Sequence, residues 1–199
     1  MIEKLKIGLV FVIVSLSLFG CATTTTTGQK LVAIEQPLNG FGVVLMPWVP
    51  DEKKTSNSSA LYSELKSMGV LLPLLFQRIP LVLEANNIEN KTILGRADPE
   101  AKGRYKVDEI LDFQYVLSIV PVRGVYQNYG GHIDMTMTTS LFDRAAKKVI
   151  WSGTINFKKH GIAKINEETA DEFARQLLVQ LNKDGIVRLS TLEPKMLSQ

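Results

Sequence analysis

The alternation of apolar and polar positions predicts a β-sheet whose strands differ in how deeply they are buried. Gly42–Trp48 is a short apolar run bounded by glycine and proline, which is typical of a buried strand. Thr92–Gly95 predicts a weaker second strand. Phe113–Tyr126 is rich in β-branched residues that are apolar on both faces, and Pro121 within it favours a bulge or an edge position.

A long segment between the first two strands has apolar residues at helical spacing. The pattern runs from residue 61 to residue 83, but Pro73 and Pro80 lie inside it. Each proline would cost about 3 kcal/mol in the interior of a straight helix. We therefore expect a break near Gly69, then a helix that starts around Pro73, is kinked at Pro80 and ends at Asn86.

The second half of the chain predicts a hairpin followed by a helix. His132–Phe142 alternates apolar and polar residues, Val149–Phe157 forms the next strand, and a short helix is expected at Asp98–Leu111. Asn166 caps a final amphipathic helix that Gly185 ends. The predicted order is β-α-β-α-β-β-β-α, an α+β fold with a mixed, mainly antiparallel sheet and helices packed on it.

The amino terminus has the features of a secretory signal. Lys4 and Lys6 precede an apolar run, Ile7–Phe19, whose thirteen residues are fewer than the ~20 that a membrane-spanning helix needs. Leu18–Cys21 resembles a bacterial lipobox. In that family the cysteine thiol receives a diacylglycerol, the signal is cut before the cysteine, and the new amino terminus is acylated, for example with palmitate.

These features divide the chain into four parts. We expect a lipoprotein signal peptide at 1–20, the lipidated cysteine with a flexible tether at 21–39, one α+β domain at 40–190 and a tail at 191–199. By resemblance to lipoproteins of two-membrane bacteria, the absence of aspartate at Ala22 favours an outer-membrane lipid anchor and a periplasm-facing domain.

The composition and the missing motifs exclude several classes of function. Lys and Arg exceed Asp and Glu by 23 to 20, and this net charge of +3 is too weak to indicate nucleic-acid binding. One cysteine excludes an intrachain disulfide framework and a cysteine-based zinc finger. The sequence has no G-x-S-x-G motif, no H-E-x-x-H motif and no glycine-rich phosphate loop. We therefore expect no enzyme activity, no cofactor and no metal.

Three segments resemble an envelope-protein family. Val43–Pro47 is similar to the "VAVLPF" first strand of proteins with a TolB amino-terminal type of domain, and Asp112–Leu117 to their "GADYVL" entry into the third strand. Leu141–Asp143 with Val149–Gly153 resembles their "LxDxxTGxxVWSG" hairpin. The resemblance covers roughly residues 40–188, and the group includes LpoB, PelC and the curli secretion lipoprotein.

The resemblance implies binding rather than catalysis. Members of the group mostly bind or assemble other envelope proteins, so a role in an export, secretion or wall-building complex is expected, and a homo-oligomer is one form that such an assembly takes. The residues Arg123, Tyr126 and Tyr129 bring basic and aromatic side chains to a predicted hairpin tip, a composition favoured at binding surfaces.

One alternative from another class stays open. A pocket near Trp48, Trp151 and the tyrosine-bearing tip would make the protein a small-ligand or glycan-binding lipoprotein. A hydrolase without a recognisable motif ranks below that.

Overall fold

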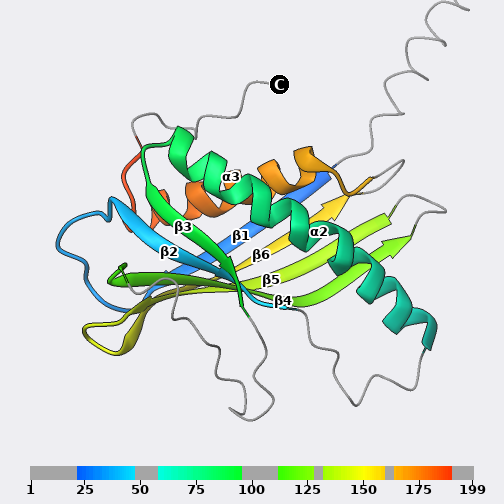
Figure 1. Ribbon diagram of the computed structural model, residues 1–199, viewed down its shortest axis with the longest axis horizontal. Coiled ribbons are helices and arrows are strands. Elements are labelled where there is room, and N and C mark those ends of the chain that lie inside the picture. Colours follow the sequence, from blue (N-terminus) through cyan, green and yellow to red (C-terminus); the bar gives the residue numbers. More distant parts are fainter. Residues whose placement is uncertain (1–21, 48–57, 96–111, 128–131, 160–163, 190–199) are drawn as a thin grey trace, which may run out of the picture.

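A six-stranded mixed sheet with two helices packed on one face forms the described part of the chain (Figure 1). The structure is a computed structural model that describes residues 22–47, 58–95, 112–127, 132–159 and 164–189. The predicted α+β class is therefore confirmed.

The sheet combines parallel and antiparallel pairs. Its strands are β1 (Ala22–Lys30), β2 (Gly40–Leu45), β3 (Glu89–Leu94), β4 (Tyr115–Gln127), β5 (His132–Asp143) and β6 (Lys148–Lys159), and the helices are α2 (Ser58–Ala85) and α3 (Glu167–Lys183). The strand order is β1-β6-β5-β4-β2-β3. β2 pairs parallel with β3 and β4, and the other pairs are antiparallel.

The β4–β5–β6 meander confirms the predicted strands. Pairing between β4 and β5 shifts register between Pro121 and Arg123, which is the predicted bulge. β2 pairs with β4 only at Val116–Ile119, so among the described strands Pro121 has a partner on the β5 side alone, and the proline lies both at a bulge and at a local edge of the sheet. The helix expected at 98–111 lies outside the described residues.

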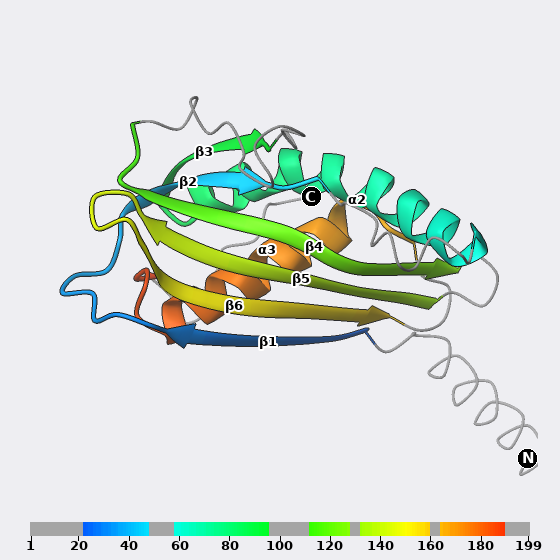
Figure 2. The ribbon, with the colours of Figure 1, turned by 90° about the horizontal axis from the view of Figure 1, so that it is seen from below.

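β1 is a strand where the sequence predicted a tether. Ala22–Lys30 pairs antiparallel with β6 over its whole length, at the outer edge of the sheet (Figure 2). The threonine run resembles low-complexity linker, but threonine is β-branched and suits a half-buried strand. Leu38 belongs to the core, and Val32 and Ile34 pack against it. Part of the segment that the sequence predicted as a flexible tether, Ala22–Lys30, is therefore a strand of the sheet.

α2 is one continuous helix, so the predicted break near Gly69 is wrong. A buried stripe of apolar residues runs past both prolines and holds the helix on the sheet: Met68, Leu71, Leu75, Ile79, Val82 and Leu83. The carbonyls that lose their partners to Pro73 and Pro80 belong to Gly69 and Phe76, which are both exposed and can bond to water.

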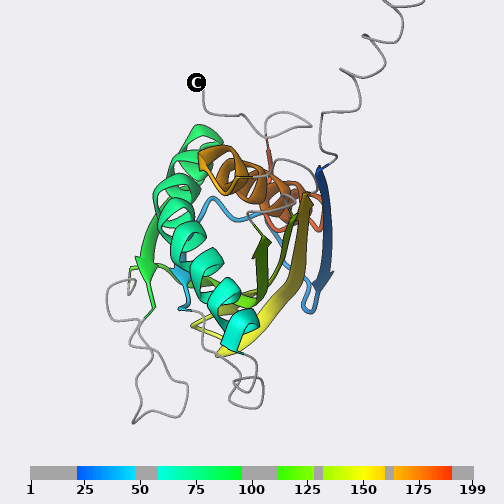
Figure 3. The same ribbon diagram turned by 90° about the vertical axis from the view of Figure 1, so that its right-hand side faces the viewer.

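α3 begins and ends as predicted. The side chain of Asn166 accepts a hydrogen bond from the backbone N–H of Thr169, and Thr169 Oγ1 accepts one in return from the backbone N–H of Asn166. Gly185 follows the helix with φ +67°. The helix buries an apolar stripe on the same face of the sheet as α2 (Figure 3).

An ion pair joins the two helices. Arg78 Nε and Nη2 donate to the two carboxylate oxygens of Asp171 at 2.7 and 2.6 Å, and Nη1 reaches Glu167 at 3.2 Å. Hydrogen bonding to Asp171 raises the pKa of the Arg78 guanidinium further above its usual range, so Arg78 stays charged. This bidentate ion pair fixes how α2 lies against α3.

Candidate interaction surfaces

The structure brings the end of β4 and the start of β5, which flank the predicted hairpin tip, to the same end of the sheet as the start of β1. In register, Ala22 lies opposite Lys159, Lys159 opposite Ile133, and Ile133 opposite Tyr126. These four residues define what we call the Ala22 end of the sheet. Figure 2 shows the tips of β4, β5 and β6 beside the start of β1 at this end.

Of the residues predicted for an interaction surface, Arg123 is the one whose side chain is described. Arg123 lies in β4 and is 56% exposed. Tyr126 is near the end of β4, where its backbone pairs with Ile133. Tyr129 and the predicted lipidation site Cys21 lie outside the described residues.

Arg123 belongs to a charge cluster that the sequence did not single out. Arg123 Nη2 lies 3.9 Å and Lys158 Nζ 3.8 Å from Oδ2 of Asp134. The carboxylate is nearly buried, with its side chain 12% exposed, whereas the side chain of Lys158 is 51% exposed. Two cations around one carboxylate leave a net positive charge. The sequence signal was the alternation along β5, which places Asp134 on the solvent face.

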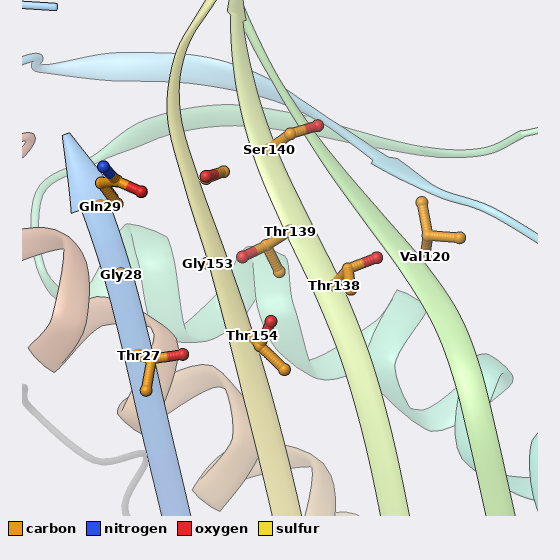
Figure 4. Close-up of a pocket in the computed structure, with 10 residues that line it drawn as sticks. Thr27, Gly28, Gln29, Val120, Thr138, Thr139, Ser140, Gly153 and Thr154 are labelled. Atoms are coloured by element: carbon orange, nitrogen blue, oxygen red, sulfur yellow. The ribbon is translucent and has the colours of Figure 1, made fainter. Parts of the chain in front are cut away.

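The exposed face of the sheet is lined by hydroxyl and amide groups. Three cross-strand rows run over β1, β6, β5 and β4: first Gln29, Ser152, Ser140 and Ser118, then Thr27, Thr154, Thr138 and Val120, and then Thr25, Asn156, Thr136 and Arg123. The first two rows, without Ser118, line an open hollow of about 730 Å³ (Figure 4). It holds no charged side chain, so it is suited to an uncharged polar ligand.

The outer side of α2 carries exposed apolar residues although it faces away from the sheet. Val70, Phe76 and Leu81 are 41%, 37% and 42% exposed. Pro73 and Pro80 lie between them on the helix surface. By length and composition Met68–Ala85 could also cross a membrane, with mean hydropathy 1.5, although 33% of this stretch is buried inside the domain.

An apolar cleft opens between α2 and the carboxyl ends of β2 and β3. Its volume is about 380 Å³, and its walls are aliphatic or thioether side chains, including Met46, Met68, Leu72 and Leu94. Among the residues that the structure describes, no group of three or more His, Cys, Asp or Glu side chains could hold a metal ion.

Trp151 is not available to a ligand pocket, which corrects the alternative prediction. Its side chain points to the helix-covered face and is 1% exposed, and its Nε1 donates to Asp184 at 2.7 Å. Gln180 donates to the same carboxylate at 2.9 Å. Trp151 therefore fixes β6 to the end of α3, and Trp48 lies outside the described residues.

Comparisons with known proteins find likeness in structure alone. No family model and no curated protein matches the sequence. A PelC dodecamer from Paraburkholderia phytofirmans is 15% identical, covers 83% of this chain and 99% of its own, and superposes with TM-score 0.48. A second PelC dodecamer, a variant from the same organism, is 16% identical over 80% of this chain and 98% of its own, with TM-score 0.47.

A third solved structure is more distant. Lipoprotein GNA1162 from Neisseria meningitidis is 14% identical, covers 72% of this chain and 99% of its own, and has TM-score 0.35. These likenesses transfer no activity, partner or assembly to this chain. The resemblance to the TolB amino-terminal domain and to LpoB stays a prediction from the sequence motifs.

Proposed function

We propose that this protein is a lipid-anchored, periplasm-facing accessory lipoprotein that docks onto or assembles with other envelope proteins and is not an enzyme. The observation that carries the proposal is the apolar outer side of α2. The sequence motifs favour an outer-membrane anchor and an export, secretion or wall-building complex as the setting.

In α2 the inner stripe is covered by the sheet, whereas Val70, Phe76 and Leu81 remain exposed on the outer side. Gln77 and Glu84 are the polar residues on that outer side among Met68–Ala85. Exposed apolar surface of this kind on a folded domain is typical of a protein-binding surface.

The test is the native mass of the complex that holds this chain, extracted from its own envelope in mild detergent. We expect the wild-type chain in an assembly with stoichiometric partners, and the double variant Val70→Glu/Leu81→Glu to run at a smaller mass. Two charges would have to be desolvated in the interface, so most of the assembly should be lost. The melting temperature should change little, because both side chains are already exposed.

Thr138→Glu is the control, because it places one such charge on the opposite, polar face of the sheet. It should leave the assembly intact. Loss of the assembly with Thr138→Glu but not with the α2 variant would move the docking surface to the sheet. A wild-type monomer that survives gentle extraction and crosslinking would overturn the docking function.

In that last case a glycan-binding lipoprotein becomes the leading candidate. The specific observation in its favour is the hollow of about 730 Å³ on the sheet face, with its uncharged hydroxyl rows. Its place differs from the pocket that the sequence suggested near Trp151.

A further inference from the structure

We propose that the Ala22 end of the sheet rests against the bilayer surface, so that the strands rise away from the membrane and the basic residues near that end face anionic headgroups. This inference rests on the proposed lipid anchor at Cys21. It adds which surface meets the membrane and which lipid chemistry that surface fits.

The first argument is covalent. Cys21 directly precedes Ala22, and consecutive Cα atoms are about 3.8 Å apart. Ala22 and Thr23 are already paired with Lys159 and Lys158 in the sheet. No spacer therefore separates the lipid attachment point from the folded domain, and the domain cannot move far from the headgroups.

The second argument is charge. Arg123, Lys158 and Lys159 lie in the last rows of the sheet at this end, all within about 10 Å of Ala22 along the strands at ~3.4 Å per residue. Asp134 lies among them. Near the start of α3, the cations Lys164 and Arg78 stand against the carboxylates of Glu167, Glu168 and Asp171, which is a net charge of −1 and does not cancel the net +2 of the strand residues. The Ala22 end is therefore net positive although the whole chain is close to neutral.

Anionic lipid is the partner that fits this arrangement. Each basic residue close to an anionic bilayer contributes about 1 kcal/mol, and the contribution decays within a Debye length of about 8 Å at physiological salt. The acyl chains hold the protein on the membrane, while the basic residues decide which end of the domain turns toward it.

This orientation determines how the other surfaces of the domain face relative to the membrane. α2 leads from the Ala22 end toward the opposite end of the sheet (Figures 1 and 2). Its apolar outer side therefore faces sideways, parallel to the membrane plane, where another protein on the same membrane can reach it. The β5–β6 turn near Lys148 stands roughly 37 Å from the Ala22 end at ~3.4 Å per residue.

The test uses the processed, lipidated full chain in vesicles of phosphatidylethanolamine and phosphatidylglycerol that carry a headgroup quencher. A fluorophore is attached to a single introduced cysteine, at Thr25→Cys near the Ala22 end or at Lys148→Cys near the opposite end. Both positions are exposed, and neither contributes to the Asp134 cluster. We expect at least several-fold stronger quenching at position 25 than at position 148.

Two charge-reversal variants test the contribution of the basic residues separately. In the Thr25→Cys background, Arg123→Glu/Lys158→Glu should reduce the preference for this orientation by roughly 5-fold or more through Lys158 and by less through Arg123, which lies more than one Debye length from Ala22. The effect should vanish in vesicles of phosphatidylcholine alone. Lys147→Glu/Lys148→Glu makes the same charge change at the opposite end and should leave quenching at position 25 unchanged.

Vesicle flotation separates the two ways in which the idea can fail. A protein that does not float has lost the lipid anchor, and the proposed function fails together with the orientation. A protein that floats but is quenched equally at both positions, or at neither, keeps its anchor and overturns the orientation alone. Equal effects of the two charge-reversal pairs would overturn the role of the basic residues.

Discussion

At the residue scale, a tryptophan, a carboxylate and two glycines fix β6 and β1 under α3. The indole of Trp151 lies against the backbone at Gly153 and donates to Asp184. Gly153 is paired with Gly28 on β1, and a Cβ at Gly28 would collide with Asp184. Both glycines are needed because other atoms occupy the space of their missing side chains.

We predict that Gly153→Ala destabilises the domain by about 2 kcal/mol or more. A Cβ there would lie 2.6 Å from the Trp151 ring and 2.8 Å from the backbone oxygen of Thr27, which cannot move without disturbing β1. The measurement is the free energy of unfolding in urea, with tryptophan fluorescence as the signal.

Gly69→Ala is the control for that substitution. Gly69 lies in α2, and a Cβ there would meet nothing within 4 Å. The same methyl group should therefore stabilise the protein by up to about 1 kcal/mol through helix propensity. Equal changes in the free energy of unfolding at the two positions would show that the loss caused by Gly153→Ala does not come from close packing around Gly153.

At the element scale, local signals predicted the structure well where they agreed with packing. The cap at Asn166, the apolar stripe and Gly185 define α3 correctly, because all three act within a few residues. The break in α2 was wrong because the buried stripe outweighs the two prolines. β1 was missed because its threonine run has no apolar alternation, and its partner strand is more than a hundred residues away.

We predict that Asp171→Asn destabilises the α2–α3 contact by about 2 kcal/mol, which lowers the melting temperature by roughly 4–8 °C. The amide keeps one acceptor but turns a donor toward the Arg78 guanidinium, and the site is largely buried. Differential scanning calorimetry measures the change.

Glu172→Gln tests whether burial and helix–helix contact cause that loss. Glu172 pairs with Arg175 within the same helix at 2.8 Å, and both side chains are partly exposed. Such a pair contributes about 0.5 kcal/mol. If Glu172→Gln lowers the free energy of unfolding as much as Asp171→Asn does, the Arg78–Asp171 contact contributes no more than an ordinary ion pair within one helix.

At the scale of the whole molecule, the interaction surface at Arg123, Tyr126 and Tyr129 stays a prediction. Arg123 was identified as a surface residue, and the structure shows it exposed beside Asp134. Its approach to Lys158 depends on strand register, which alternation alone does not determine. The outer side of α2 was not recognised, because the apolar pattern was followed along one helical stripe from residue 61 to residue 83, and Val70, Phe76 and Leu81 lie off that stripe.

The last prediction concerns the proposed lipid anchor at Cys21. Cys21→Ser should release the protein from the membrane, because no thiol remains to accept a lipid, and should leave the melting temperature unchanged, because the described domain begins at Ala22. Flotation of cell envelopes is the measurement, and Ala22→Ser is the control that should remain bound. A Cys21→Ser protein that stays acylated and floats would contradict the lipobox interpretation.

The position of β1 also determines how the protein bears a mechanical load. With the proposed anchor and orientation, a force that draws the lipid out of the bilayer would be applied at Ala22 and would act along the axis of β1. The β1–β6 hydrogen bonds are perpendicular to that axis, so the pull shears all nine paired positions together and does not peel them apart singly. Extraction of the acyl chains should therefore move the domain as a unit before β1 is torn from the sheet.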